Sequence, residues 1–278
     1  MVDGFTREQL RFALRLADES RRLLSAAANR SFSVDVKDDK SFVTEVDRAI
    51  EARLRELIAD DRPRDGVMGE EYGSHSLDAE IVWILDPVDG TAPFIAGIPV
   101  FGTLIAASRF GEPWLGILDF PTTNDRWVGV YGVFAERNGV PVRTRRCSTL
   151  RSALATCSNP DFFQPAEYAA LARIRKEVRY TLYGASSFAY GALASGRTDL
   201  AVDSGLKPYD VFAPAAVISG AGGVITQWCG AEIGLDTDGR ILAAGDPRVH
   251  REALGLLRAA TAADTADGYD HAVAVGGV

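Results

Sequence analysis

Apolar residues recur at helical spacing over about the first sixty positions, and this pattern predicts two amphipathic helices. The first begins at Thr6-Arg7-Glu8-Gln9, which has the form of a capping box, and runs to about Asn29. Residues 31–41 are polar and charged and indicate a loop or hairpin. Thr44 can cap the second helix, which Asp60-Asp61-Arg62-Pro63 ends. Each helix has one apolar face, so both are expected to cover a core.

The pattern changes near residue 80, where strands replace helices. Residues 81–85 form a continuous apolar run that predicts a buried strand, and this run stops at Asp86-Pro87. Further strands are predicted at 103–108, 114–120 and 127–134, with turn residues between them. Consecutive strands without intervening helices favour an antiparallel meander.

A polar, basic segment at 143–151 separates this meander from a region in which strands and helices alternate. Such alternation is typical of an α/β layered structure. We therefore predict an N-terminal α+β half (1–145), a C-terminal α/β half (146–262) and a disordered tail (263–278). The predicted strands of the second half are 153–157, 178–183 and 200–202, and its helices are 164–176, 186–195, 210–220 and 247–260.

Composition narrows the class of protein. The chain has 278 residues, of which 47% are hydrophobic and 24% charged, so it can bury a sizeable core. A net charge of −8 argues against nucleic acid as a partner, although an acidic protein can bind anions where metal ions supply positive charge. The three cysteines are scattered and predict neither disulfides nor a cysteine zinc site. The charged N-terminus and the lack of long apolar runs predict a cytoplasmic protein with no membrane partner.

Three acidic segments stand out by their context: Gly69-Glu70-Glu71, Asp86-Pro87-Val88-Asp89-Gly90-Thr91 and Tyr209-Asp210, with Asp47 as a further candidate. Asp86 and Asp89 are spaced i and i+3 around a proline turn, so both can face one point where the strand ends. Carboxylates packed together repel one another unless a cation lies between them. Oxygen ligands of this kind select Mg²⁺, Mn²⁺ or Ca²⁺ over zinc.

The residues after Asp89 suggest a phosphate site beside these carboxylates. Gly90-Thr91 can open a helix whose free N–H groups would cradle an anion, and Pro93 suits its first turn. Each signal alone is weak, because an Asp-Pro-x-Asp-Gly sequence is a common turn and a lone Gly-Glu-Glu is usually a solvated face. Their joint occurrence in this order indicates metal-assisted phosphoryl transfer.

Taken together, the chain resembles the inositol monophosphatase superfamily of metal-dependent phosphatases over about residues 5–260. The segments that carry the resemblance are Thr44-Glu45-Val46-Asp47, Gly69-Glu70-Glu71, Trp83-Ile84-Leu85-Asp86-Pro87-Val88-Asp89-Gly90-Thr91, Tyr209-Asp210 and Gly220-Ala221-Gly222-Gly223. Three others resemble the histidinol-phosphate phosphatase branch: Phe101-Gly102-Thr103-Leu104-Ile105-Ala106, Gly116-Ile117-Leu118-Asp119-Phe120-Pro121 and Gly205-Leu206-Lys207-Pro208.

The resemblance implies a five-layered α-β-α-β-α sandwich (mixed α+β and α/β) of the inositol monophosphatase/fructose-bisphosphatase type, usually a homodimer. It implies up to three Mg²⁺ ions, which Mn²⁺ could replace. The implied metal ligands are Glu70, Asp86, the Val88 carbonyl, Asp89 and Asp210. Asp47, Glu70 and Thr91 would orient and deprotonate the attacking water, and Gly90 and Thr91 would hold the phosphate. The implied substrate contacts are Asp89, Ala185, Ser186 and Asp210.

The substrate expected from the resemblance is a small phosphorylated metabolite, with histidinol phosphate of histidine biosynthesis first. Ser186 stands where that branch typically has an acidic residue, which weakens the match to a substrate ammonium group. Inositol phosphate, a sugar phosphate or a specialised-metabolite phosphate therefore stay open. Two alternatives of another class are an inactive metal-binding scaffold and a Ca²⁺-stabilised structural domain. The complete acidic set disfavours the scaffold, and the sequence lacks the tight run of alternating acidic ligands that is typical of a calcium loop.

Overall fold

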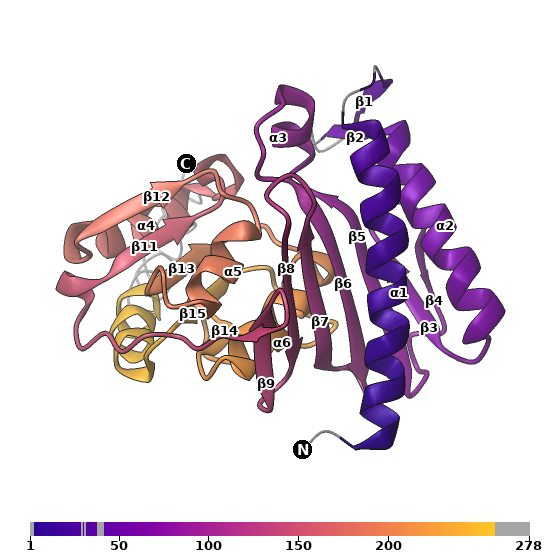
Figure 1. The fold of residues 1–278 in the computed structure, drawn as a ribbon. Helices are drawn as coiled ribbons and strands as arrows, with labels where there is room; N and C mark the ends of the chain where they lie inside the picture. The colour runs from indigo at the N-terminus through magenta and orange to yellow at the C-terminus, as the bar shows by residue number, and fades with distance from the viewer. Residues whose placement is uncertain (1–2, 29, 31, 38–41, 259–278) are drawn as a thin grey trace, which may run out of the picture.

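Helices and sheets alternate in five layers, in the order α-β-α-β-α, in a computed structural model of the chain (Figure 1). The structure describes residues 3–258 except 29, 31 and 38–41. The predicted sandwich is therefore confirmed, whereas the predicted tail at 263–278 lies outside the described residues.

The first sheet has eight strands in the order β10-β9-β8-β7-β6-β5-β3-β4. Its neighbours pair antiparallel, as the predicted meander requires, except that β3 runs parallel to β5. A separate two-stranded hairpin, β1 with β2, precedes it. The strands are β1 (Val34–Val36), β2 (Phe42–Thr44), β3 (Gly66–Gly69), β4 (Gly73–His75), β5 (Ile81–Asp89), β6 (Gly102–Arg109), β7 (Glu112–Phe120), β8 (Asp125–Val130), β9 (Phe134–Arg137) and β10 (Val140–Pro141).

The second sheet has five strands in the order β12-β11-β13-β15-β14, and residues 142–149, which have no regular structure, lead into it from the first. Its strands are β11 (Leu154–Cys157), β12 (Tyr180–Tyr183), β13 (Leu200–Asp203), β14 (Val224–Gln227) and β15 (Ile241–Ala244). The α-helices of the described residues are α1 (Gly4–Ala27), α2 (Glu45–Asp61), α3 (Thr91–Ala96), α4 (Pro165–Glu177), α5 (Phe188–Ala194) and α6 (Pro208–Gly220), together with residues 247–258. Two short 3-10 helices lie at Leu150–Ser152 and Pro160–Phe162.

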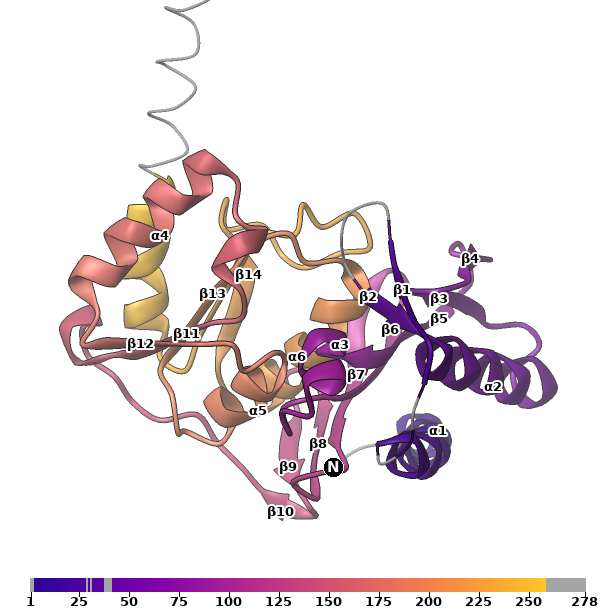
Figure 2. The ribbon, with the colours of Figure 1, turned by 90° about the horizontal axis from the view of Figure 1, so that it is seen from above.

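Three hydrophobic clusters join the five layers. One lies between α1, α2 and the first sheet, and another lies between the second sheet, α4 and the helix at 247–258. The third surrounds α5 and α6, which fill the space between the two sheets, as Figure 2 shows. Every residue from Val211 to Ile218 is buried, because α6 is covered on all sides.

Glycines let α6 lie directly on the backbone of the first sheet. A Cβ at Gly116 in β7 would stand 2.4 Å from the Ala213 carbonyl oxygen, and one at Gly129 in β8 would stand 2.5 Å from the Val217 Cα. Such distances exclude any side chain without a shift of the helix. This close contact fixes the first turn of α6, and hence Asp210, relative to the end of β5.

Three local predictions differ from the structure. Asp3, and not Thr6, caps α1, because the Thr6 N–H donates to Asp3 Oδ1 over 2.7 Å. The strand predicted at 127–134 is two strands, since residues 131–133 form the turn between β8 and β9. The strand predicted at 81–85 continues to Asp89, and its pairing with β6 shifts register between Asp86 and Asp89. The Thr44 cap of α2 is confirmed.

We predict that Gly129→Ala lowers the free energy of unfolding by about 1–3 kcal/mol, because the methyl group would overlap the backbone of α6. Gly255→Ala is the matched control: it lies in the helix at 247–258, and apart from the backbone of that helix no atom of the described residues lies within 4 Å of the added Cβ. This control should leave stability unchanged or raise it by up to about 1 kcal/mol. Urea unfolding measures both, and equal stabilities would contradict the proposed close packing.

Candidate active site

Two neighbouring parallel strands end at the same edge of the first sheet and bring three predicted ligands there. β5 ends with Asp86 and Asp89, and β3 is followed directly by Glu70. The Glu70 N–H donates to the Leu85 carbonyl over 3.3 Å, which extends the parallel pairing to the residue beside Asp86. The apolar character of β5 explains this placement, because a wholly buried strand exposes functional groups only at its end.

Asp210 reaches the same region from the first turn of α6. Its Oδ2 accepts a hydrogen bond of 2.6 Å from the Lys207 N–H, so the carboxylate also caps its own helix. The same carboxylate also acts on the proposed ligands, because its negative charge raises the pKa of Glu70 and of Asp86.

These four carboxylates raise one another's pKa. Burial, reinforced by the charge of Asp210, raises the pKa of Glu70 to about 7. Burial also raises the pKa of Asp89 and of Asp210 to about 7, and neighbouring negative charges add to both. The pKa of Asp86, which is 2% exposed, is raised most clearly, first by burial and then by Glu70, Asp89 and Asp210. Protons or cations must therefore accompany the group at neutral pH.

Several oxygens of the group already have partners, among them both oxygens of Asp89. Lys37 of the β1–β2 hairpin places its Nζ 2.8 Å from Glu70 Oε1 and 2.7 Å from Glu71 Oε1. Asp86 Oδ1, in contrast, is buried and has no hydrogen-bond partner among the residues that the structure describes. Within the described part of the chain, no three Asp, Glu, His or Cys side chains are gathered closely enough to enclose an ion as they stand. Cation binding would therefore require side-chain rotation and release of Glu70 from Lys37.

Asp47 and Thr91, both predicted to be catalytic, lie in contact. Thr91 Oγ1 is 3.3 Å from Asp47 Oδ1 and 3.1 Å from the Val88 carbonyl oxygen, so its proton can serve either acceptor. The other oxygen of Asp47 accepts the Thr44 N–H over 2.9 Å and also the Thr44 hydroxyl. Burial raises the pKa of Asp47, which is fully inaccessible.

The predicted phosphate turn and the predicted substrate residues meet at Gly90. This glycine has φ 78°, a left-handed conformation, and begins α3. A Cβ there would stand 2.7 Å from Ser186 Oγ, so the segment containing Ala185 and Ser186 lies directly against the turn. Ser186 itself has φ 44°, which is unusual for a residue other than glycine and is found preferentially at functional sites.

The residue that contacts a predicted ligand most directly in this segment is Ser187, which sequence reasoning did not single out. Its N–H donates to Asp89 Oδ2 over 2.9 Å and its hydroxyl donates to Asp89 Oδ1 over 3.0 Å. Ser187 precedes α5, so the central helical layer fixes both oxygens of a carboxylate that the first sheet supplies. The only signal in the sequence was a serine at a predicted helix start.

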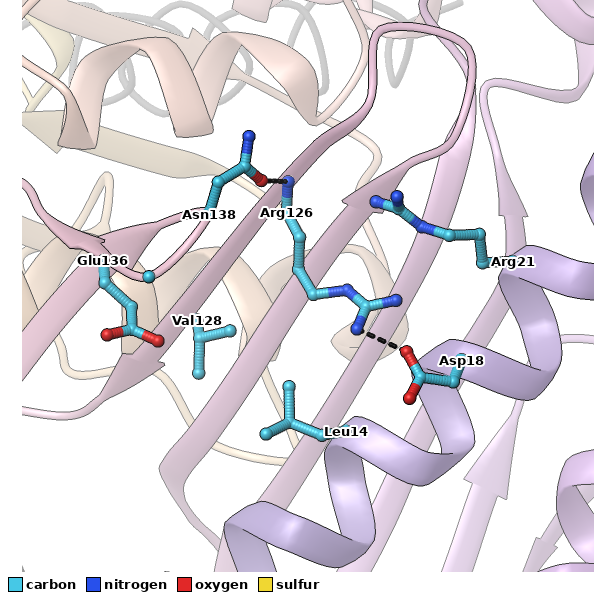
Figure 3. A pocket seen from close by; sticks show the side chains of 8 residues that line it. Leu14, Asp18, Arg21, Arg126, Val128, Glu136 and Asn138 are labelled. Atoms are coloured by element: carbon cyan, nitrogen blue, oxygen red, sulfur yellow. Dashed lines mark hydrogen bonds and ion pairs between the residues drawn. The ribbon is translucent and has the colours of Figure 1, made fainter.

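The surface pocket in Figure 3 lies away from this group, between α1 and strands β8 and β9. It has a volume of about 310 Å³, and Arg126 donates there to Asp18 over 2.6 Å. Arg126 and Arg21 also bind the buried Asp119, so the arginines are engaged in ion pairs that tie α1 to the sheet. We assign this pocket a structural role.

Residues 6–263 match the inositol monophosphatase family, and this chain belongs to that family. It is accordingly a phosphoric monoester hydrolase, as the acidic motifs predicted. No helix in the described ranges has the length and apolar character that a membrane span needs.

Relatives that carry three different names each match most of this chain. The bifunctional phosphatase IMPL2 of Arabidopsis thaliana is 40% identical, over 87% of this chain and 72% of its own. The histidinol-phosphatase of Mycobacterium tuberculosis is 32% identical, over 91% of this chain and 98% of its own. The inositol-1-monophosphatase ImpA of Mycolicibacterium smegmatis is 30% identical, over 84% of this chain and 86% of its own.

Solved structures agree with the fold. An inositol monophosphatase from Zymomonas mobilis has a TM-score of 0.83 at 34% identity, over 92% of this chain and all of its own. An inositol monophosphatase/NADP phosphatase that holds Mg²⁺ and phosphate has a TM-score of 0.80, over 91% of this chain and 96% of its own. It is 16% identical, so this second likeness shows the fold alone.

We predict that Ser187→Ala lowers the kcat/KM of phosphate release about tenfold, because Asp89 loses a charge-assisted hydrogen bond of roughly 1.5 kcal/mol. Ser187→Thr, which keeps a hydroxyl, should retain most of the activity. Ser152→Ala is the control, since that exposed hydroxyl contacts only Thr149. Unchanged kinetics in Ser187→Ala would show that the backbone N–H alone positions Asp89.

Proposed function

We propose that this chain is a Mg²⁺-dependent phosphatase of a small soluble metabolite, with histidinol phosphate as the first candidate substrate. The observation that carries the proposal is the mutual electrostatic influence of four acidic side chains, from the end of β3, from β5 and from α6, and the buried Asp86 Oδ1, which has no hydrogen-bond partner among the described residues. Such a group is stable at neutral pH only with added positive charge, and the ammonium of Lys37 already supplies some.

The residues present suit a hard divalent cation. The proposed ligands are Glu70, Asp86, the Val88 carbonyl, Asp89 and Asp210, which offer only oxygen atoms, and Mg²⁺ or Mn²⁺ favours that set over zinc. When bound, such ions neutralise charge on the phosphoryl group and on the attacking and leaving oxygens. This role supplies the positive charge that an acidic chain of net charge −8 otherwise lacks.

The remaining chemistry is assigned to residues of the chain itself. Gly90 and Thr91 are proposed to bind the phosphate through backbone N–H groups at the start of α3. Asp47, Glu70 and Thr91 are proposed to orient the attacking water and take its proton, because Thr91 already donates toward Asp47. Attack by that water on phosphorus, opposite the leaving oxygen, breaks the ester P–O bond and forms inorganic phosphate without a covalent phosphoenzyme, and the leaving oxygen takes a proton from solvent water to depart as the alcohol.

Substrate choice is proposed to depend on Ser186 with Asp89, Ala185 and Asp210. Histidinol-phosphatases at 30% and 32% identity support the first candidate. The inositol monophosphatase at 30% identity supports inositol phosphate as the second, and so does a neutral hydroxyl at Ser186 beside the Gly90 turn. A sugar phosphate or specialised-metabolite phosphate would suit the same neutral hydroxyl. The homodimer, the cytoplasmic location and the division into halves at residue 145 remain predictions.

We predict that Asp89→Asn abolishes phosphate release while the protein stays folded, because the amide keeps the shape but loses the charge that a cation needs. The loss should exceed about 100-fold, the upper range for perturbing a metal site through its surroundings. Asp78→Asn, a change at an exposed loop position, is the matched control. Phosphate release with Mg²⁺ and with chelator, together with circular dichroism, tests this. Near-wild-type turnover in the variant would refute the metal assignment, and no turnover in the wild type would favour the scaffold.

A second prediction concerns substrate. Among histidinol phosphate, inositol 1-phosphate, sugar phosphates and nucleotides, the wild type should release phosphate fastest from histidinol phosphate. Ser186→Asp should raise the preference for histidinol phosphate over inositol phosphate about tenfold, because a carboxylate can pair with the ammonium. Ser186→Asn, which keeps the shape without the charge, is the control. If Ser186→Asp and Ser186→Asn showed the same preference for histidinol phosphate over inositol phosphate, Ser186 would not belong to the substrate site.

A further inference from the structure

A fully buried carboxylate, Glu51, lies in α2 one turn after Asp47 and outside the group of proposed ligands. Asp47 and Glu51 are spaced i and i+4, so both project from one face of the helix toward the end of the first sheet. A buried glutamate is rare unless charge and hydrogen bonds compensate it. Its partners therefore indicate what it does.

Glu51 receives three hydrogen bonds, two of them from the backbone just after Glu70. The Glu71 N–H donates to Oε2 over 2.7 Å, and the Tyr72 N–H donates to Oε1 over 3.1 Å. Arg55, one turn further along α2, donates its Nε–H to Oε1 over 2.8 Å. The same arginine donates through Nη2 to the Gly73 carbonyl. The Glu51–Arg55 pair therefore binds two N–H groups and one carbonyl group of the turn at residues 71–73.

The residue before Glu70 also packs directly against the Glu51 carboxylate. Gly69 ends β3, and a Cβ added there would stand 2.0 Å from Glu51 Oε1. Glu51 thus touches the chain on both sides of Glu70, while the Glu70 N–H is held by the Leu85 carbonyl of β5. The backbone around Glu70 is thus held by Glu51 and by β5, and its side chain pairs with Lys37.

We infer that Glu51 is a positioning residue, which sets the approach of Glu70 to the divalent cation and thereby the affinity of the site for it. This inference rests on the proposed metal-dependent function. The physical reason is that a ligand carboxylate binds a cation well only when its backbone is already in place. Residues that position the coordinating side chains therefore affect metal affinity strongly. A glutamate suits this role because it can accept two backbone N–H groups at once.

Glu51→Gln tests the inference, because the amide keeps the size but turns one acceptor oxygen into an NH₂ that faces an N–H donor. We expect Mg²⁺ affinity, measured by calorimetry without substrate, to fall about tenfold. We expect kcat at saturating Mg²⁺ and the KM for the phosphate ester to stay near wild type. Glu56→Gln is the matched control, since Glu56 lies on the same helix and pairs with Arg53 at the surface.

A purely structural Glu51 would give another pattern. The Glu51→Gln variant would then lose thermal stability, yet bind Mg²⁺ as tightly as the wild type, and this result would overturn the inference. If the wild type itself took up no Mg²⁺, the proposed function would fail first. If the wild type and the folded Glu51→Gln variant bound Mg²⁺ equally tightly, the role of Glu51 would be rejected and the proposed function would stand.

Gly69→Ala perturbs the same contact through the residue before Glu70. It is the alternative test if Glu51→Gln does not fold. The added methyl group would push against Glu51 Oε1 and displace either the carboxylate or the chain before Glu70. Mg²⁺ affinity should again fall by about tenfold, with kcat recovered at high Mg²⁺. Gly73→Ala, where an added Cβ meets no atom within 4 Å but φ is 70°, controls for general loss of glycine flexibility in this turn. Wild-type affinity in Gly69→Ala would contradict the inference.

Discussion

Repulsion between carboxylates held together away from water is the constraint on which this structure depends. Asp86 and Asp89 are buried, and Glu70 and Asp210 are close enough to raise the pKa of Asp86. A fold tolerates such a group only if other contacts hold each member in place. The surrounding residues do this for three of the four: Ser187 holds Asp89, the Lys207 N–H holds Asp210, and Glu51 accepts hydrogen bonds from the turn after Glu70.

The site belongs to no single layer of the sandwich. The first sheet supplies Glu70, Asp86 and Asp89, whereas the central layer supplies Ser187 and Asp210. Their alignment is set by the packing of α6 on β7 and β8, where glycines allow backbone contact. Stability and chemistry are therefore coupled, since a displaced α6 would carry Asp210 away from the end of β5.

The sequence predicted what depends on local pattern and failed where distant residues decide. The apolar run ending at Asp86 located the edge of the sheet, and the Thr44 cap located the start of α2. Ser187 could not be predicted, because its partner Asp89 lies 98 positions away and only the packed layers bring the two together. Strands of four residues are too short to establish a period, so they were found unevenly: β11 and β13 were predicted, whereas β14 and β15 were missed. At α1, Asp3 and Thr6 both suit a cap, and local sequence does not decide between them.

The close contact between Gly129 and Val217 has a consequence for inheritance. These positions lie on either side of residues 142–149, so a recombination event in that stretch would separate them. A chimera would then combine the first sheet of one parent with α6 of another. A single methyl group at position 129 would displace α6 and carry Asp210 away from the carboxylates at the end of β5. Since the atoms of α6 at this contact belong to its backbone, position 129 must be glycine whichever parent supplies the helix.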